Sequence, residues 1–206
     1  MKNIAFLLIM AIGLSNFALS QNSSPEEILA KHYNAVGLEN LKKANSIVMT
    51  GSITRQDVMP LTITKLRPDK YRIDFSVQDV PAIQSYNGKI AWQTMPWTGN
   101  VAPQMVPEAR TGDFKNRADF EGPLVNWKEK GFLLDMVGID TVNDVETYNL
   151  KLTRPDGSAE YFFIGTNDYL LHLQRNYRKG RDGSDVEVNV FLSDYREVKG
   201  ERKSVV

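Results

Sequence analysis

Few side chains in this sequence are of the types that carry out catalysis. The chain has no cysteine, which excludes thiol nucleophiles, thiolate metal sites and disulfides. Its two histidines, His32 and His172, are 140 positions apart, and neither belongs to a metal-binding motif such as H-E-x-x-H. Both lie among apolar residues, which is typical of a structural histidine. We therefore expect no metal site, no cofactor and no catalytic residue.

Three nearby carboxylates, Asp113, Asp119 and Glu121, are the remaining candidates for chemistry. They could act as a general acid and base or hold a hard cation, which would make the protein a secreted hydrolase. Carboxylates beside a helix start are, however, expected for helix-dipole reasons alone. The sequence also lacks a G-x-S-x-G elbow, a phosphate-binding glycine loop and a dinucleotide fingerprint. We predict that the protein is not an enzyme.

Large apolar residues are concentrated in the stretch from Tyr86 to Trp97. Asn87-Gly88 is a strong hairpin signal, and the expected turn type has a positive φ at both positions. Four large apolar residues follow within eight positions: Ile90, Trp92, Met95 and Trp97. Methionine adapts its shape and tryptophan is broad, so the mixture suits a cavity for a greasy ligand. The alternative is that these side chains only seal a covering segment onto a sheet.

The spacing of apolar residues along the chain predicts where its helices and strands lie. Ser24-Pro25-Glu26-Glu27 has the capping-box pattern of a helix start, and an apolar stripe leads to a helix end at Gly37. From Ala44 the period changes to 2, which predicts five strands up to residue 95 and five more between residues 133 and 192. These short alternating strands indicate an antiparallel meander.

The insert at about 97–131 interrupts this alternation of apolar and polar residues. Within it we predict a loop over Trp97 to Pro107, a helix over Glu108 to Arg117, and a turn with a second short helix over Asp119 to Trp127. The predicted fold class is mainly β (α+β). One large curved antiparallel sheet forms an incomplete barrel, and the N-terminal helix and the helical insert cover its apolar concave face.

The N-terminus and the charge balance indicate where the protein works. Residues 1–20 have a lysine, an apolar run and small residues before a cleavage site, which predicts a signal peptide cut between Ser20 and Gln21. The mature chain, residues 21–206, is then one exported domain, expected in the periplasm as a monomer. Lys plus Arg and Asp plus Glu are 25 each, so nothing favours nucleic acid. The basic run Tyr177 to Arg181 is interpreted as a solvated hairpin end.

Three segments resemble a known family. Residues 67–72, Arg-Pro-Asp-Lys-Tyr-Arg, match an R-P-x-x-F/Y-R strand start, and residues 86–92 match a D-G-K-x-x-W hairpin ahead of a proline, here Pro96. These motifs resemble the periplasmic outer-membrane lipoprotein carrier (LolA-like) superfamily. With the Ala118 to Gly131 segment added, the mature chain is most similar to the outer-membrane lipoprotein-sorting proteins of Bacteroidota. Three features depart from the carriers: Asn87 replaces the usual aspartate, the 97–131 insert is not the carriers' own lid sequence, and the C-terminal residues show no convincing final strand.

The resemblance implies a half-barrel with a lid over a cavity that receives acyl chains of a lipoprotein or lipid, for transfer toward the outer membrane. It implies that Arg72 is a latch holding the lid shut and that Trp92 is a cavity wall. The full set of expected ligand-binding residues is Ile63, Ile73, Phe75, Trp92, Met95, Trp97, Leu124 and Trp127. Expected partners are the acyl chains or lipid and inner- and outer-membrane transfer proteins. The alternative on the same fold is a periplasmic sensor or regulatory module that binds lipid or a protein.

Overall fold

A computed structural model describes residues 23–54, 58–180, 182–198 and 201–203 of the protein. The expected signal peptide and its cleavage site lie outside these residues. Within them, most of the chain forms antiparallel strands, accompanied by three α-helices and one short 3₁₀ helix. No helix in this part of the chain is long and apolar enough to cross a membrane.

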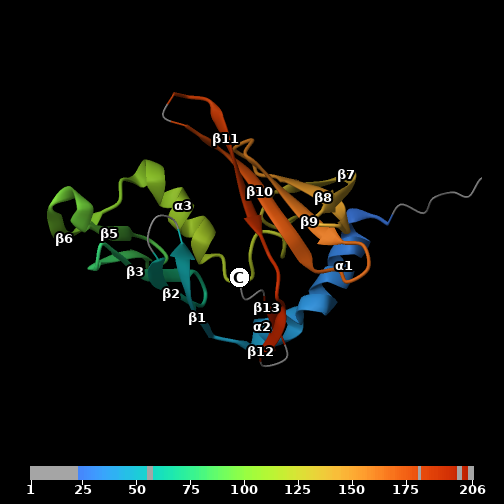
Figure 1. The fold of residues 1–206 in the computed structure, drawn as a ribbon, viewed down its shortest axis with the longest axis horizontal. Helices are drawn as coiled ribbons and strands as arrows, with labels where there is room; N and C mark the ends of the chain where they lie inside the picture. Colours follow the sequence, from blue (N-terminus) through green and yellow to red (C-terminus); the bar gives the residue numbers. More distant parts are fainter. Residues whose placement is uncertain (1–22, 55–57, 181, 199–200, 204–206) are drawn as a thin grey trace, which may run out of the picture.

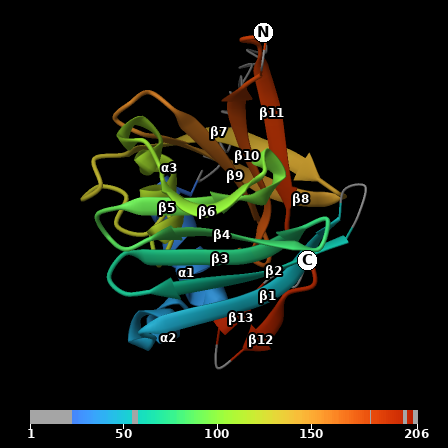
Figure 2. The same cartoon turned by 90° about the vertical axis from the view of Figure 1, so that its left-hand side faces the viewer.

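The first sheet has six strands, which follow one another in chain order (Figure 2). They are β1 (Ser46–Thr54), β2 (Val58–Leu66), β3 (Lys70–Val77), β4 (Val80–Tyr86), β5 (Ala91–Met95) and β6 (Asn100–Met105). Tight antiparallel connections join neighbouring strands, as the alternating pattern predicts. β6 ends the sheet at one edge and β1 at the other.

The second sheet has five strands in the order β11-β10-β9-β8-β7. They are β7 (Leu133–Val142), β8 (Val145–Thr153), β9 (Ala159–Gly165), β10 (Leu171–Lys179) and β11 (Asp185–Phe191). A two-stranded hairpin of β12 (Arg196–Val198) and β13 (Glu201–Lys203) follows and contacts the first two helices, α1 and α2. Figure 1 shows the second sheet beside the first, with the strands of the two sheets running in different directions.

This architecture confirms a mainly β, antiparallel fold that does not close into a barrel. The sheet is nevertheless divided, where the sequence predicted one continuous sheet. β6 and β7 are separated along the chain by α3 (Glu108–Ala118) and a run of turns up to residue 131. Strands joined through such a segment are not held in register by a tight turn, so the two halves of the meander form separate sheets.

α1 (Pro25–Val36) packs against the second sheet. Its capping box is complete, because the Ser24 hydroxyl accepts from the Glu27 amide and the Glu27 carboxylate accepts from the Ser24 amide. Gly37 ends the helix with φ 71° and leads into the short α2 (Leu38–Lys43). The buried side chains of this core come from α1, the second sheet and the turns after α3: Ile28, Leu29, Leu124, Leu150, Leu152, Phe162 and Ile164. This core fixes α1 across the second sheet.

α3 covers the first sheet instead (Figure 1). It buries Phe114 and Ala118 against Tyr71 and Tyr86, and so forms a second core separate from the one under α1. The helix confirms the sequence prediction for this part of the insert. For Asp119 to Trp127 the predicted turn is present, but the predicted short helix is wrong: the segment is a series of turns, because Gly122 and Asn126 take left-handed φ values of 92° and 53°.

The residues before α3 also differ from their prediction. The expected loop from Trp97 to Pro107 contains a 3₁₀ turn, η1 (Pro96–Thr98), and the edge strand β6. The side chains of Val101 and Met105 in β6 are both exposed, so no apolar face marks this strand in the sequence. Its Pro103 is compatible with an edge position, where one side of the strand needs no hydrogen-bond partner.

The turn at Asn87-Gly88 forms where predicted but has a different geometry. Only Gly88 has a positive φ, at 96°. The Asn87 side-chain oxygen accepts from the amides of Lys89 and Ile90 at 3.0 and 2.9 Å. A four-residue Asx-type connection therefore replaces the expected two-residue turn. A Cβ at Gly88 would lie 2.8 Å from the Asp69 carboxylate, so this position requires glycine.

Candidate ligand-binding cavity

A cavity of about 830 Å³ lies on the face of the first sheet that α3 partly covers. Its lining is mostly aliphatic and aromatic: Ile53, Met59, Leu61, Ile73, Phe75, Val77, Gln78, Gln84, Trp97 and Arg117. A volume of several hundred Å³ with apolar walls and a few polar groups is typical of small-molecule sites. We call this face of the sheet the inner face and the opposite one the outer face.

Strand alternation places the apolar lining on one side. Ile73, Phe75 and Val77 are alternate residues of β3 and therefore point the same way. The pairing of Leu61 with Phe75 adds β2 to the same surface. On β1 the residue opposite Leu61 is Gly51, and a Cβ there would meet no atom within 4 Å. On the inner face, β1 therefore leaves free space beside Gly51.

The polar groups of the cavity lie toward α3. Arg117, near the end of that helix, donates from a guanidinium nitrogen to the Gln84 side-chain oxygen at 3.0 Å. Its guanidinium centre also lies 6.0 Å from the Phe114 ring centre. Burial raises the pKa of the neighbouring Tyr71 hydroxyl, and the positive charge of Arg117 partly opposes this shift. The cavity therefore has one cationic, hydrogen-bonding region beside an apolar one.

Three of the predicted ligand-binding residues meet in this cavity. Ile73 and Phe75 line it from β3, and Trp97 lines it from η1, although the tryptophan side chain is 52% exposed. The Phe75 and Trp97 ring centres are 6.3 Å apart. Ile63 pairs with Ile73 on the same face but packs into the core under α3. Met95 ends β5, where its sulfur lies 3.4 Å from the Gln93 amide nitrogen.

Trp92 and Arg72 lie on the outer face, which corrects their predicted placement. Arg72 pairs with Ser85, and Ser85 pairs with Trp92, so all three point away from the side that carries Ile73. Arg72 makes a bidentate pair with Asp74 two residues along its own strand. An arginine held in this way does not reach the lid from the inner face, so Arg72 does not have the position of a latch.

Leu124 and Trp127 belong to the core beneath α1 rather than to the cavity. Leu124 is buried with Ile28 and Leu29, and Trp127 packs against the same cluster. The sequence predicted both of them in one lid with Trp97. The structure separates them because the turns after α3 carry residues 119–131 across to the second sheet.

Two of the three predicted acidic residues, Asp119 and Glu121, are held in ion pairs. Asp119 accepts from Lys130 at 2.5 Å, and Glu121 pairs with Arg67 at 2.6 Å. Asp113 is exposed on α3. Arg67 also donates to the Ala44 carbonyl and stacks on the Phe120 ring, with its guanidinium centre 4.1 Å from the ring centre. These contacts fasten the turns after α3 to the first sheet, which gives the carboxylates a structural role.

The two histidines also have structural partners. The buried His32 donates from Nδ1 to the Tyr169 carbonyl at 2.8 Å, and burial lowers its pKa. His172 Nε2 lies 2.9 Å from the Asp168 carboxylate. Across the described part of the chain, no group of three or more acidic or histidine side chains could hold a metal ion.

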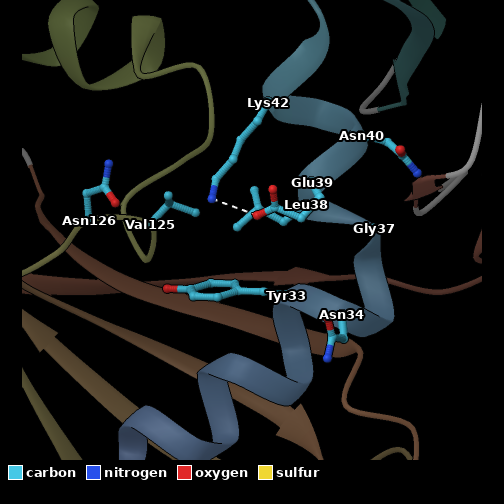
Figure 3. Close-up of a pocket in the computed structure, with 9 residues that line it drawn as sticks. All are labelled: Tyr33, Asn34, Gly37, Leu38, Glu39, Asn40, Lys42, Val125 and Asn126. Carbon is cyan, nitrogen blue, oxygen red and sulfur yellow. Dashed lines mark hydrogen bonds and ion pairs between the residues drawn. The ribbon is translucent and has the colours of Figure 1, made fainter.

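A smaller pocket of about 170 Å³ lies where α1 meets α2 (Figure 3). Tyr33 forms its base and donates to the Leu124 carbonyl at 2.6 Å, while Val125 and Asn126 line the opposite side. Burial raises the pKa of Tyr33 to about 12, so the hydroxyl stays protonated. The Lys42–Glu39 ion pair lies at the rim. The volume falls below the usual range for ligand sites, and we assign this pocket to helix packing.

Sequence reasoning missed Ile53, Met59, Leu61, Val77, Gln78, Gln84 and Arg117. The first four were detectable, because they occupy alternating apolar positions of β1, β2 and β3, the strands next to or carrying Ile63 and Ile73. Arg117 had no such signal. A lone arginine near a helix end is usually solvated, and only the packing of α3 on β3 and β4 brings it to the cavity.

Comparison with known proteins gives the fold. No protein-family model matches the chain, and no curated protein matches it. A DUF1329-family protein from Desulfovibrio piger superimposes with a TM-score of 0.54 at 15% identity, covering 88% of this chain and 84% of that one. A LolA-superfamily protein from Nitrosomonas europaea gives 0.52 at 12% identity, with 88% and 83% covered. The chain has the fold of the LolA superfamily.

A third structure agrees with this result. A domain named for outer-membrane lipoprotein sorting, from Vibrio parahaemolyticus, gives a TM-score of 0.52 at 11% identity, with 86% of this chain and 81% of that one covered. The LolA-like fold expected from the sequence is therefore confirmed. At such identities the likeness concerns the fold, and function has to be argued from the cavity.

Proposed function

We propose that this protein is a non-enzymatic periplasmic carrier that shelters the acyl chain of a lipoprotein or lipid for transfer toward the outer membrane. The observation that carries the proposal is the apolar cavity of about 830 Å³ on the inner face of the first sheet. The names of two fold relatives, a LolA-superfamily protein and a lipoprotein-sorting domain, support the same reading. Transfer proteins in the inner and outer membranes would be its partners.

The energetics favour an alkyl chain as the occupant. Each buried methylene contributes about 0.8 kcal/mol, so a sixteen-carbon chain gains on the order of 10 kcal/mol before ordering costs. The lining supplies aliphatic and aromatic contact rather than convergent polar groups, which suits a chain without hydrogen-bonding atoms. The described lining residues include no carboxylate, histidine or serine, so they supply no nucleophile or general base.

Native mass spectrometry of the protein purified from the periplasm of an expressing bacterium tests the proposal. We expect a bound species whose mass matches one acylated molecule per chain and which is lost on delipidation and regained on adding lipid. A protein that neither retains nor acquires lipid would contradict the carrier function. If lipid is absent and an envelope extract yields one stoichiometric protein partner, the sensor or regulatory alternative replaces it.

A further inference from the structure

Arg117 is the one charged side chain among the described residues that line the cavity. The other lining residues are apolar apart from Gln78 and Gln84, and none is acidic. Arg117 is exposed to solvent, which screens its attraction for an anion, while the apolar lining on its cavity side lowers the local dielectric constant and strengthens that attraction. The cavity therefore has an electrostatic preference as well as an apolar one.

The guanidinium of Arg117 has no carboxylate partner among the described residues, whereas five of the other seven arginines with described side chains have one. Arg67, Arg72, Arg154, Arg175 and Arg196 each pair with an aspartate or glutamate. Arg117 instead donates to the neutral Gln84 amide oxygen and to the Tyr71 hydroxyl, and lies near the Phe114 ring. A guanidinium has five N–H donors, so most remain for a ligand.

The polar and apolar parts of the cavity lie at different positions along the strands of the first sheet. Gln84, the partner of Arg117, is paired with Ile73. Phe75 and Val77 follow on the same face of β3, and Val77 lies about 13 Å beyond Ile73 at roughly 3.3 Å per residue. The Arg117 guanidinium therefore lies near one end of a row of apolar side chains that runs along the strands.

We propose that the cargo is an amphiphile with an anionic oxygen headgroup, a carboxylate or a phosphate, whose head binds Arg117 while its alkyl chain lies along β2 and β3 toward Val77. This inference rests on the proposed carrier function and narrows its ligand class. Guanidinium and oxyanion form paired, charge-assisted hydrogen bonds that fix the position of the head. The Gln84 amide nitrogen has two further donors next to the same point. Arg117 thus determines specificity, and the apolar lining supplies affinity.

Calorimetric titration with three twelve-carbon ligands tests the inference: dodecanoate, dodecyl phosphate and dodecanol. We expect the wild-type protein to bind at least one of the anionic ligands ten-fold or more tightly than dodecanol. Arg117→Gln should reduce that ratio to near one without weakening dodecanol binding, and Arg117→Lys should retain part of it. Arg110→Gln removes the same charge from an exposed position on the same helix and should leave the ratio unchanged.

The outcomes separate this inference from the proposed function. Equal binding of dodecanol and both anions, or an Arg117→Gln protein that discriminates like wild type, would overturn the role of Arg117 and leave the carrier function standing. Failure of all three ligands to bind would overturn both. A preference for dodecanoate or for dodecyl phosphate supports the inference and identifies which oxyanion the site takes.

Discussion

Gly51→Trp is a substitution that should fill the cavity without disturbing the fold. Gly51 lies in β1, directly opposite Leu61 on the inner face, and a Cβ there would meet no atom within 4 Å. Its φ is outside the left-handed region, so a side chain introduces no backbone strain. An aromatic residue also suits a strand better than glycine does. We therefore expect the variant to unfold at the same denaturant concentration as wild type, or higher.

The size of the effect on binding follows from the strand geometry. An indole at position 51 occupies about one repeat of the inner face, roughly 7 Å along the strand, and excludes about five methylenes of an extended chain. At about 0.8 kcal/mol each, the loss is about 4 kcal/mol, or roughly 1,000-fold in Kd. Calorimetric titration with palmitate measures this change directly.

Thr50→Trp provides the matched control. Thr50 is the neighbouring residue of β1, and it pairs with Thr62 on the outer face. The control adds the same bulk to the same strand and should leave palmitate affinity within about two-fold of wild type. The reasoning is refuted if Gly51→Trp binds as well as Thr50→Trp, or if Thr50→Trp is the weaker binder.

Four further substitutions test the framework and its pH dependence. Leu150→Ala, at a fully buried position under α1, should cost about 2–5 kcal/mol in urea unfolding. Glu121→Gln leaves the partly buried Arg67 without its carboxylate and should cost about 1–3 kcal/mol, whereas Glu39→Gln, in an exposed pair, should unfold at the same urea concentration as wild type. The pKa of His32 is lowered in the folded state, so the unfolded chain takes up a proton first as pH falls through about 6.5. Stability should be fully present above this pH and decline below it, and His32→Gln should flatten that part of the pH–stability profile measured by denaturation.

The sequence predicted the elements whose local signals are complete. The capping box at Ser24 and the left-handed cap at Gly37 defined α1 at both ends, and the alternation of Tyr71, Ile73, Phe75 and Val77 defined β3. It did not predict the division into two sheets, because the pairing partners of edge strands depend on how the chain between them packs. The edge strand β6 was missed for a related reason, since exposed residues on both of its faces leave no periodic signal.

The candidate site was predicted only in part. Alternation identifies which residues share a face, but it does not say which face is covered, and this is why Trp92 was placed in the cavity and lies outside it. The resemblance assigned a latch to Arg72, whereas Arg67 makes the contacts that fasten the turns after α3 to the first sheet. Arg117 became visible only through the tertiary packing of α3.

Photo-crosslinking with a fatty acid that bears a diazirine near its chain end, followed by mass-spectrometric mapping, tests the central claim most directly. A chain held in the cavity predicts attachment to inner-face residues such as Ile53, Leu61 and Phe75, and loss of that attachment in Gly51→Trp. Attachment to the outer face around Trp92, or to the small pocket at Tyr33, would contradict the account. So would labelling of the inner face that Gly51→Trp leaves unchanged.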